Sequence, residues 1–371
     1  MINVINFINF LKNQGIDYYT GVPDSLMKNF CDYINSNKEI NNIVNHNEGG
    51  AIAFAAGNYL TNKKPCLVYL QNSGQGNCIN PLISLTHPKV YSIPMLLLIG
   101  WRGEPEIKDE PQHMKQGEIT EELLQLCDIP FEILDIENWK SQIEKANNFM
   151  IENKSPFAIL VKKNTFEKTN IVKKENNFNL VRENVLKKII QNTNDDQIIF
   201  STTGKISREI YEVRKELNKE SDLDFYNVGA MGHVSQIALG ASFKTNKKIL
   251  CIDGDGSLIM HMGTLATIGS YQPNNFVHIL INNEAHESVG GQKTASSEIN
   301  FLEIAKGCNY KYIKSIINEQ ELDDFLKNSE LKYPAFIEIK VKLMSRDNLK
   351  RPEDTTLERK EKFLNKLENA N

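Results

Sequence analysis

The chain has 371 residues, of which 40% are hydrophobic and 24% are charged, and a formal net charge of −4. This length is typical of two or three domains, and the composition excludes an intrinsically disordered chain. The slightly negative charge provides no basic field for nucleic acid or an anionic membrane, so an anionic substrate would need local cations. Six scattered cysteines without a CxxC pair indicate free thiols in a reducing cytosol.

The N-terminal residues 1–11 have the pattern of an amphipathic helix, without the basic segment and cleavage site of a signal peptide. The longest apolar run, at residues 93–100, is too short to span a bilayer. We therefore expect a soluble, cytoplasmic protein that binds neither membrane nor nucleic acid.

Short apolar runs of β type alternate with helical stretches along the whole chain. Helices are predicted at residues 25–34 and from Glu48 onward, in an alanine-rich segment that follows a short run at residues 43–44. The main predicted strands are residues 66–70, 95–99, 157–161, 197–200, 249–252, 277–281 and 335–339. Strands that are apolar on both faces and separated by helices favour an α/β fold with parallel sheets flanked by helices.

The chain becomes polar and charged between residues 162 and 183. We place a linker at residues 165–177, between a first domain at residues 1–164 and a second at residues 178–371. At the end of the second domain, a charged helix is predicted at residues 357–367. It either packs on a neighbouring chain or is a solvated face.

Two polar segments follow predicted strands of the second domain. DGDGS occupies residues 253–257, and Asn282 and Asn283 follow the run at residues 277–281. Gly254 and Gly256 allow a tight turn that brings backbone amides and the N-terminus of a helix at residues 258–268 towards a phosphate. Carboxylate and amide oxygens suit Mg²⁺. The sequence therefore predicts a magnesium and phosphate site at the carboxyl ends of these strands.

GDG followed by 25 residues and then NN resembles the signature of the thiamine-diphosphate-dependent enzymes. The resemblance implies thiamine diphosphate and Mg²⁺ as cofactors and a fold of two thiamine-diphosphate-binding domains. It implies that Asp255, Asn283 and the backbone carbonyl of Ala285 hold the metal. Gly254, Gly256 and Ser257 would then lie against the diphosphate.

Members of this family use a carboxylate of the first domain to protonate the aminopyrimidine of the cofactor. Glu48, at the start of its alanine-rich helix, is the candidate, although an acid there also complements the helix dipole. Because the diphosphate site belongs to the second domain, the resemblance implies active sites between two chains of a homodimer or a higher homo-oligomer.

Two further segments match the family. VGAMGH at residues 228–233 implies that the Gly229 carbonyl binds the aminopyrimidine and that Met231 bends the cofactor, although a methionine is also ordinary core filler. STTGK at residues 201–205 follows a predicted strand, so Gly204 and Lys205 are candidate contacts of the diphosphate.

A narrower resemblance rests on GVPDS at residues 21–25, QNSGQGN at 71–77, the stretch from GWRG to PQH at 100–113, and AHESVGGQ at 285–292. These segments are similar to the phosphonopyruvate decarboxylases and their relatives, the sulfopyruvate decarboxylases, which lack a middle domain. The resemblance implies decarboxylation of 3-phosphonopyruvate to phosphonoacetaldehyde and CO₂ in phosphonate biosynthesis. Glu284 departs from the pattern, because relatives commonly have glycine there.

Decarboxylation is favoured when the departing carboxylate is not neutralised, so cations should gather at the phosphonate. Arg102 is the main predicted ligand, because its guanidinium matches a tetrahedral anion. The other predicted substrate-binding residues are Lys205, Asp24 and Gln75, and further possible cations are Arg208, His113 and Lys293.

Asp24 is predicted to protonate the reacting carbon and His113 to act as a general acid. Simpler roles remain open: Asp24 as a helix-capping turn residue, His113 as a loop residue and Arg102 as a solvated charge.

Three other functions remain open. Sulfopyruvate decarboxylation would give sulfoacetaldehyde, and the sulfonate of its substrate carries one fewer negative charge than a phosphonate. A thiamine-dependent carboligase is disfavoured because the chain leaves no room for a middle domain. A non-catalytic cofactor-binding protein is disfavoured by the joint presence of Glu48, Asp255 and Asn283.

Overall fold

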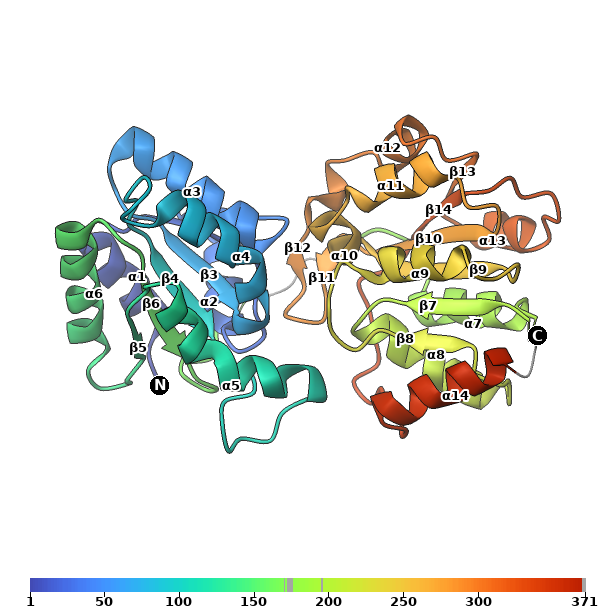
Figure 1. Cartoon of the computed structure of the whole chain (residues 1–371), viewed down its shortest axis with the longest axis horizontal. Coiled ribbons are helices and arrows are strands. Elements are labelled where there is room, and N and C mark those ends of the chain that lie inside the picture. Colours follow the sequence, from blue (N-terminus) through green and yellow to red (C-terminus); the bar gives the residue numbers. More distant parts are fainter. Residues whose placement is uncertain (170, 172–175, 195, 369–371) are drawn as a thin grey trace. The chain divides into compact units, whose positions relative to one another are not determined.

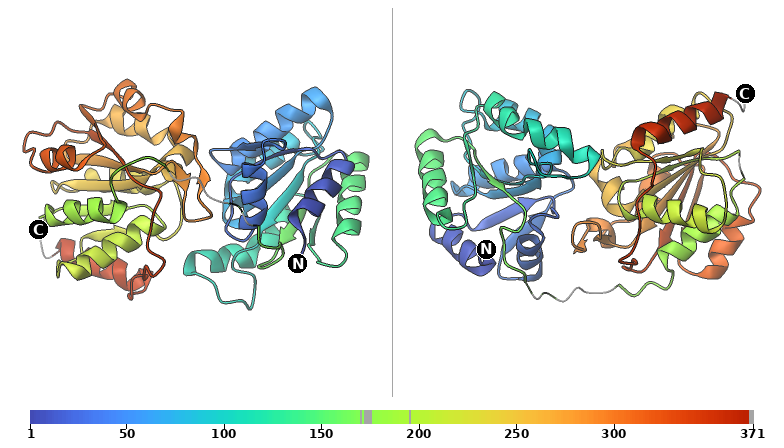
Figure 2. Two further views of the ribbon diagram at one scale, coloured as in Figure 1. Left: turned by 180° about the vertical axis from the view of Figure 1, so that it is seen from behind. Right: turned by 90° about the horizontal axis from the view of Figure 1, so that it is seen from below.

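The computed structural model describes residues 1–169, 171, 176–194 and 196–368. Contacts between Cα atoms divide the chain into two compact units. Unit 1 comprises Met1–Lys173 with Val289–Gln292, and unit 2 comprises Lys174–Ser288 with Lys293–Asn371. Each unit is a six-stranded sheet with helices on both faces (Figures 1 and 2).

The sheet of unit 1 is parallel throughout and has the order β2-β1-β3-β4-β6-β5. Its strands are β1 (Tyr18–Gly21), β2 (Asn41–Val44), β3 (Leu67–Gln71), β4 (Leu96–Gly100), β5 (Phe131–Ile133) and β6 (Phe157–Val161). Its helices are α1 (Val4–Asn13), α2 (Lys28–Ser36), α3 (Glu48–Asn62), α4 (Gln75–Pro81), α5 (Pro111–Leu126) and α6 (Trp139–Asn153), with short helical turns η1 (Asn72–Gly74) and η2 (Leu82–Thr86).

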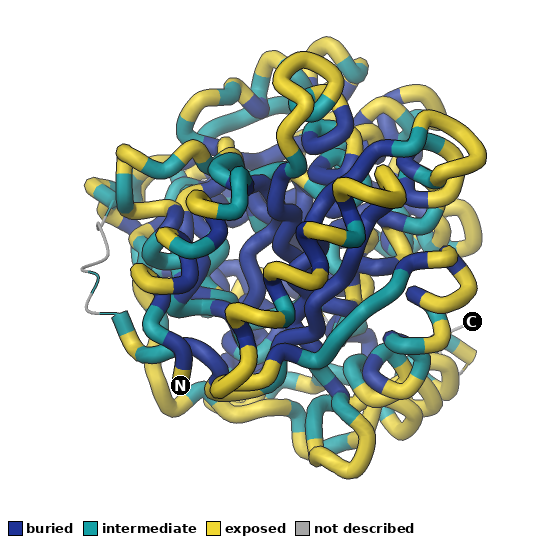
Figure 3. The backbone as a smooth tube through the Cα atoms, turned by 90° about the vertical axis from the view of Figure 1, so that its left-hand side faces the viewer, coloured by how far each residue is buried: buried dark blue, intermediate teal, exposed yellow. Residues whose placement is uncertain are grey.

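The period-two alternation of β3 divides the interior of unit 1 into two cores. Leu67 and Tyr69 pack with residues of α1, α2 and α6, whereas Val68 and Leu70 pack with residues of α3, α4 and α5. Figure 3 shows these buried strands inside a layer of exposed residues. Because both faces of the sheet are covered, the central strands are apolar on both sides.

Unit 2 has a second parallel sheet, of order β13-β14-β10-β9-β7-β8. Its strands are β7 (Ile198–Ser201), β8 (Asp224–Tyr226), β9 (Ile249–Gly254), β10 (Phe276–Asn282), β13 (Tyr312–Ile316) and β14 (Ala335–Lys340). The helices α7 (Arg182–Gln191), α8 (Lys205–Glu216) and α13 (Glu319–Leu326) contribute to one core, and α9 (Val234–Ser242), α10 (Asp255–Met260), α11 (Thr264–Tyr271) and α12 (Phe301–Gly307) to the other. The remaining elements are the small ladder β11 (Ala285–His286) and β12 (Gln292–Lys293), the turn η3 (Ala295–Ser297) and the C-terminal helix α14 (Thr356–Glu368).

The predicted α/β class with two parallel sheets is confirmed, but two helices differ from their predicted extents. The helix predicted at residues 258–268 is interrupted, because α10 ends at Met260 and α11 begins at Thr264. Gly263 precedes α11, and glycine is a poor helix former. The helix predicted at residues 25–34 begins later, at Lys28.

The predicted linker at residues 165–177 lies partly outside the described residues. Its first residues do not belong to a linker, because Phe166 is buried against Phe7 and Phe30 in the core of unit 1. The exact domain boundary therefore stays a prediction.

One face of the C-terminal helix α14 packs on its own chain, and none of its described residues is fully buried, which agrees with the predicted solvated face. Packing on a neighbouring chain stays a prediction. Its Phe363 ring contacts Phe200 of β7 and Phe225 of β8 in an aromatic cluster. The Arg359 guanidinium lies over the rings of Tyr211 and Tyr226. Within the described residues, no helix has the length and apolar character needed to cross a bilayer.

Candidate active site

In unit 2, the predicted cofactor residues follow neighbouring strands. Asn283 follows β10, Asp255 follows β9, Gly204 follows β7 and Gly229 follows β8. The carboxyl ends of parallel strands meet at one edge of the sheet, where open α/β folds bind ligands. The topology therefore gathers these residues at one edge of unit 2.

Asp255 is a buried carboxylate at the start of α10. Its side chain is 3% exposed and accepts hydrogen bonds from Thr294 Oγ1 at 2.5 Å and Ser296 Oγ at 3.0 Å. Burial raises the pKa of Asp255 to about 6, because these neutral hydroxyls offset only part of the desolvation of its charge. A cation at this carboxylate would remove the remaining penalty.

Asn283 and Ala285 form a tight turn after β10. Asn283 Oδ1 accepts a hydrogen bond from the Ala285 amide at 3.1 Å, and Asn283 Nδ2 donates to Glu287 Oε2 at 2.9 Å. The Ala285 carbonyl accepts from the Glu287 amide at 2.9 Å. Glu284 has a φ of 59°, in the left-handed region that favours glycine, so the departure at this position changes the side chain but preserves the turn.

These residues fit a magnesium ion by their chemistry. A carboxylate, an amide oxygen and a backbone carbonyl are hard oxygen ligands of the kind that Mg²⁺ takes together with phosphate oxygens and water. Among the described residues, no three His, Cys, Asp or Glu side chains converge on one point. A metal here would thus depend on this mixed set of oxygens.

Ser257 supports the predicted diphosphate site. Its hydroxyl oxygen accepts hydrogen bonds from Thr202 Oγ1 at 2.9 Å and from the Gly232 amide at 3.2 Å. A serine hydroxyl has two acceptor lone pairs and one donor hydrogen. With both lone pairs used, the Ser257 proton is directed to a third partner, as binding of a phosphate oxygen requires.

The predicted glycines of this edge are not equivalent. A Cβ added at Gly204, which has a φ of 96°, would lie 2.6 Å from Ser288 Oγ, and one at Gly256 would lie 2.8 Å from His286 Nδ1. At Gly254 a Cβ would meet only ordinary contacts. The chain itself thus requires glycine at residues 204 and 256, whereas the prediction for Gly254 depends on the ligand alone.

The predicted cation Lys205 is engaged within its own chain. Its Nζ lies 3.2 Å from Glu287 Oε1 and also contacts Ser345. Lys293 is exposed and paired with Glu298 at 3.2 Å, and Arg208 is half-buried on α8.

Gly229 and Met231 lie in the segment between β8 and α9. Both are half-buried, and Met231 belongs to none of the hydrophobic cores formed by the described residues. This location does not support core filling as the role of Met231.

In unit 1, polar residues again follow neighbouring strands. Glu48 follows β2, Asp24 follows β1, Asn72 follows β3 and Arg102 follows β4. The edge therefore collects two carboxyl groups and a guanidinium.

Glu48 is buried at the N-terminus of α3, with 5% of its surface exposed. Its Oε2 accepts a hydrogen bond from Asn77 Nδ2 at 2.7 Å, and a Cβ at Gly74 would overlap its carboxyl group. Burial raises the pKa of Glu48, and the bond from Asn77 opposes this only in part. The position also suits a helix-dipole acid, but burial and a raised pKa are typical of a proton-transfer group.

Asp24 is fully buried between β1 and α2. Its Oδ1 accepts from Gln71 Nε2 at 2.6 Å, and its Oδ2 has no hydrogen-bond partner among the described residues. Burial raises its pKa, although backbone hydrogen bonds from Leu26 and Met27 oppose the rise. Asp24 thus caps the turn before α2 and also presents a free carboxyl oxygen.

Arg102 is held by Asp109 rather than solvated. Its Nε lies 2.7 Å from Asp109 Oδ2, its Nη2 contacts Asp109 Oδ1, and its Nη1 donates to Ser25 Oγ at 3.0 Å. The charge of Arg102 also stabilises the ionised form of Asp24. Burial and the Arg102 charge lower the pKa of His113 to about 4, so its imidazole is neutral at pH 7.

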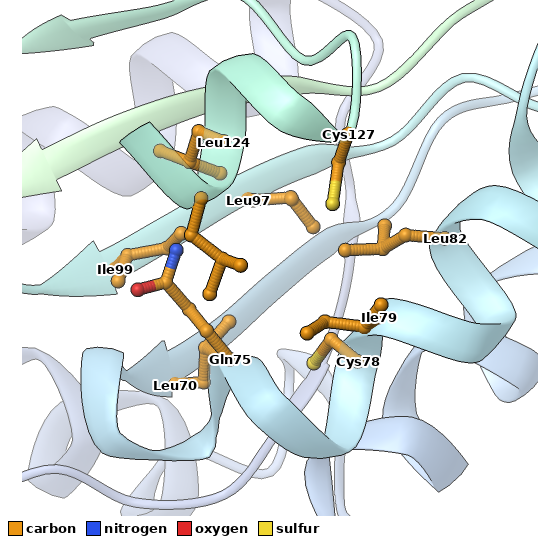
Figure 4. Close-up of a pocket in the computed structure, with 10 residues that line it drawn as sticks. Leu70, Gln75, Cys78, Ile79, Leu82, Leu97, Ile99, Leu124 and Cys127 are labelled. Carbon is orange, nitrogen blue, oxygen red and sulfur yellow. The ribbon is translucent and has the colours of Figure 1, made fainter. Parts of the chain in front are cut away.

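Gln75 is buried in an apolar surrounding. Its Nε2 lies 3.5 Å from the Thr120 carbonyl, and its side chain sits among Leu70, Leu97 and Ile99 (Figure 4). The cavity there measures about 10 Å³, which is room for about one water molecule and not for an oxoacid. These contacts favour a packing role for Gln75.

Several partners at these edges were not predicted as site residues. Asn77, Asp109 and Thr294 each bind a predicted residue, but they lie 29, 7 and 39 positions from it in the sequence. Asn77 belongs to a segment that the narrower resemblance had marked, so a search there for amide donors would have found it. Thr294 carries no comparable signal.

Comparison with known proteins then identifies the family. The model of thiamine pyrophosphate enzymes, N-terminal TPP binding domain, matches residues 6–124, and that of the C-terminal TPP binding domain matches residues 202–339. A phosphonopyruvate decarboxylase of Streptomyces viridochromogenes is 31% identical over 98% of this chain and 94% of its own. The chain belongs to the family of thiamine-pyrophosphate-dependent decarboxylases.

Other decarboxylases of the family show the same relationship. The phosphonopyruvate decarboxylase of Streptomyces hygroscopicus is 31% identical over 84% of this chain and 80% of its own. In Methanocaldococcus jannaschii, the beta subunit of sulfopyruvate decarboxylase is 39% identical over 39% of this chain and 73% of its own, and the alpha subunit is 36% identical over 41% and 88%. As a decarboxylase of this family, the chain is a carboxy-lyase that uses thiamine pyrophosphate.

Proposed function

We propose that this decarboxylase converts 3-phosphonopyruvate to phosphonoacetaldehyde and CO₂, as a step of phosphonate biosynthesis. The observation that carries the proposal is the near-full-length similarity to phosphonopyruvate decarboxylases. Asp255, Asn283 and the carbonyl of Ala285 would hold Mg²⁺. Lys205, Gly204, Gly256 and Ser257 would contact the diphosphate.

Thiamine diphosphate supplies, when bound, the nucleophilic carbon and the electron sink that decarboxylation requires. Glu48 holds a proton in a buried site and exchanges it with the pyrimidine ring. Its raised pKa suits this task, because a general acid works best when its pKa lies near the working pH. Asn77 orients its carboxyl group by the hydrogen bond to Oε2.

Arg102 would bind the phosphonate, and Asp24 would supply the proton that replaces CO₂ on the substrate carbon. The unpartnered Oδ2 of Asp24 and its raised pKa support this role, because a buried carboxyl group retains its proton. Asp109 already accepts hydrogen bonds from Nε and Nη2 of Arg102, so the substrate anion must compete with this carboxylate for the guanidinium. A dianionic phosphonate competes better than a monoanionic sulfonate.

Sulfopyruvate decarboxylation is the second candidate, and the similarity to both subunits of the M. jannaschii enzyme favours it. In that enzyme the two matching parts are separate subunits. This organisation also supports a homodimer or larger homo-oligomer for the present chain, with Glu48 of one copy serving the cofactor site of another.

The test is CO₂ release by metal-stripped protein that is supplied with thiamine diphosphate and Mg²⁺. Phosphonopyruvate, sulfopyruvate and pyruvate are compared in parallel. The proposal requires turnover of phosphonopyruvate well above the others, and only with both cofactors. Preference for sulfopyruvate would show that the proposed substrate is wrong, and no CO₂ release from any of the three would show that the proposed decarboxylation is wrong.

Two variants then test the anion site. Arg102→Lys removes the planar fork, and we expect KM for phosphonopyruvate to rise ~10–100-fold. Asp109→Asn removes the charge that competes with the substrate for Arg102. Because this competition favours the dianionic phosphonate, we expect the ratio of kcat/KM for phosphonopyruvate to that for sulfopyruvate to fall. If Arg102→Lys leaves KM unchanged, the phosphonate is bound elsewhere.

A further inference from the structure

A buried ionic cluster lies behind the predicted metal site of unit 2. Arg182, Glu209 and Glu287 are 3%, 1% and 11% exposed at their side chains. We propose that Glu287 is a positioning residue of the metal site, which sets the orientation of the Asn283 side-chain amide. The inference rests on the proposed role of Asn283 as a magnesium ligand.

Each oxygen of Glu287 has a defined partner. Oε2 accepts from Asn283 Nδ2 at 2.9 Å and contacts Arg182 Nη1, and Oε1 lies 3.2 Å from Lys205 Nζ. Arg182 is in turn held by Glu209 through two hydrogen bonds of 2.7 Å. Glu287 therefore joins α7, α8 and the turn after β10 at one point.

The chemistry of the contact decides which atom Asn283 turns away from Glu287. An ionised carboxylate only accepts hydrogen bonds, whereas the amide of asparagine has a donating and an accepting end. Glu287 can therefore bind only Nδ2, which leaves Oδ1 on the other side, where it meets the Ala285 amide. A metal ion requires that oxygen, because the NH₂ group offers it no lone pair.

The carboxyl group of Glu287 also lies in a chain of ion pairs whose charges alternate in sign. Two cations, Arg182 and Lys205, face two anions, Glu209 and Glu287. Glu209 binds the Arg182 guanidinium through two hydrogen bonds, and the Arg182 fixed in this way holds the Glu287 carboxylate in one position. Glu287 is thus both fixed in place and limited to accepting, which are the two properties that orient a neighbouring amide.

The decisive experiment exchanges the amide and the carboxylate between residues 283 and 287. Alone, Asn283→Asp adds a negative ligand, which should strengthen the binding of a cation. Beside Glu287 it places two carboxylates against each other, so we expect metal affinity to fall ~10-fold or more. In the double variant Asn283→Asp/Glu287→Gln, the glutamine NH₂ can donate to the new carboxylate, and affinity should return to the unmodified level or exceed it.

Affinity is measured without turnover, as Mn²⁺ binding by electron paramagnetic resonance in saturating thiamine diphosphate. Glu209→Gln is the matched control, because it weakens the anchor of Arg182 but does not touch Asn283. We expect it to lower the melting temperature and to leave Mn²⁺ affinity within about twofold. An equal loss of affinity in Glu209→Gln and Glu287→Gln would show that Glu287 only supports the fold.

The outcomes separate this inference from the metal assignment. If Asn283→Ala leaves Mn²⁺ affinity unchanged, the assigned metal site is wrong. If Asn283→Ala loses Mn²⁺ but Asn283→Asp binds as well as the unmodified protein, the metal site stands and the role of Glu287 is overturned. The Asn283→Asp result is sufficient by itself if Glu287→Gln does not fold.

Discussion

At the residue scale, the chemistry proposed for unit 1 depends on two carboxyl groups that folding removes from water. Glu48 and Asp24 are 5% and 0% exposed, and burial raises the pKa of both. Each keeps one amide donor, Asn77 or Gln71, which holds the carboxyl group in place. Burial thus favours the protonated form while the hydrogen bonds determine where the proton is presented.

The substitution Glu48→Gln separates the effect of the buried carboxyl group on activity from its effect on stability. Activity should fall ~10²–10⁴-fold, because glutamine cannot exchange the proton. The stability of the folded variant, in contrast, should rise relative to that of the unmodified protein. The raised pKa means that the folded protein holds this proton to higher pH than the unfolded chain does, so Glu48 costs stability as pH rises through its folded pKa.

The melting temperature of the cofactor-free protein checks the second part. Relative to the unmodified protein, Glu48→Gln should gain stability from pH 5 to pH 8. A constant difference across that range would show that Glu48 titrates normally and is not desolvated in solution.

Gly74 tests how closely the chain surrounds Glu48. The backbone at Gly74 has φ −87°, which alanine accepts, but the added Cβ would overlap the Glu48 carboxyl group. We therefore expect Gly74→Ala to reduce kcat ~10-fold or more by displacing that group. Gly76→Ala is the control, because a Cβ there meets no atom within 4 Å. Equal activity of the two variants would contradict the observed position of Glu48.

At the element scale, the helix after each strand determines what the site can bind. In unit 2, the N-terminus of α10 follows β9 directly, so backbone amides and Asp255 arrive together. In unit 1, α3 begins with Glu48 itself. The start of a helix thus carries the proposed anion-binding turn in one unit and the proposed proton-transfer group in the other.

The C-terminal helix α14 packs partly buried residues against one core of unit 2. Phe363 packs its ring against Phe200 and Phe225, whereas the next residue, Leu364, is 45% exposed. Phe363→Ala should lower the free energy of unfolding of this unit by about 2 kcal/mol, less than a fully buried phenylalanine would. Urea denaturation measures the change, with Leu364→Ala as the control. If the two variants lose the same free energy, α14 does not pack as described.

At the scale of the whole molecule, the division of the proposed site residues between the units predicts complementation. Glu48 belongs to unit 1 and Asp255 to unit 2. If active sites form between two copies, Glu48→Gln and Asp255→Asn proteins are each inactive alone. After subunit exchange in an equal mixture, half of the dimers carry one intact site, so activity should recover to about a quarter of the unmodified value.

The readout is decarboxylation before and after exchange, together with the oligomeric state by light scattering. A mixture that stays inactive although mixed dimers form would show that each site lies within one chain. A monomer with full activity would lead to the same conclusion.

The sequence by itself determined the parallel α/β class, the family and the polar residues at the strand ends. These features are local: apolar strands, the DGDGS turn and the Asn283 turn each occupy a few consecutive residues. Tertiary structure decided the partners. Asn77 at Glu48, Ser25 at Arg102 and Glu287 at Lys205 come from other elements, and burial changes pKa only once the chain is packed. The spacing of residues along the chain predicts local turns and strands. Desolvation and long-range hydrogen bonds depend instead on which elements the fold brings together.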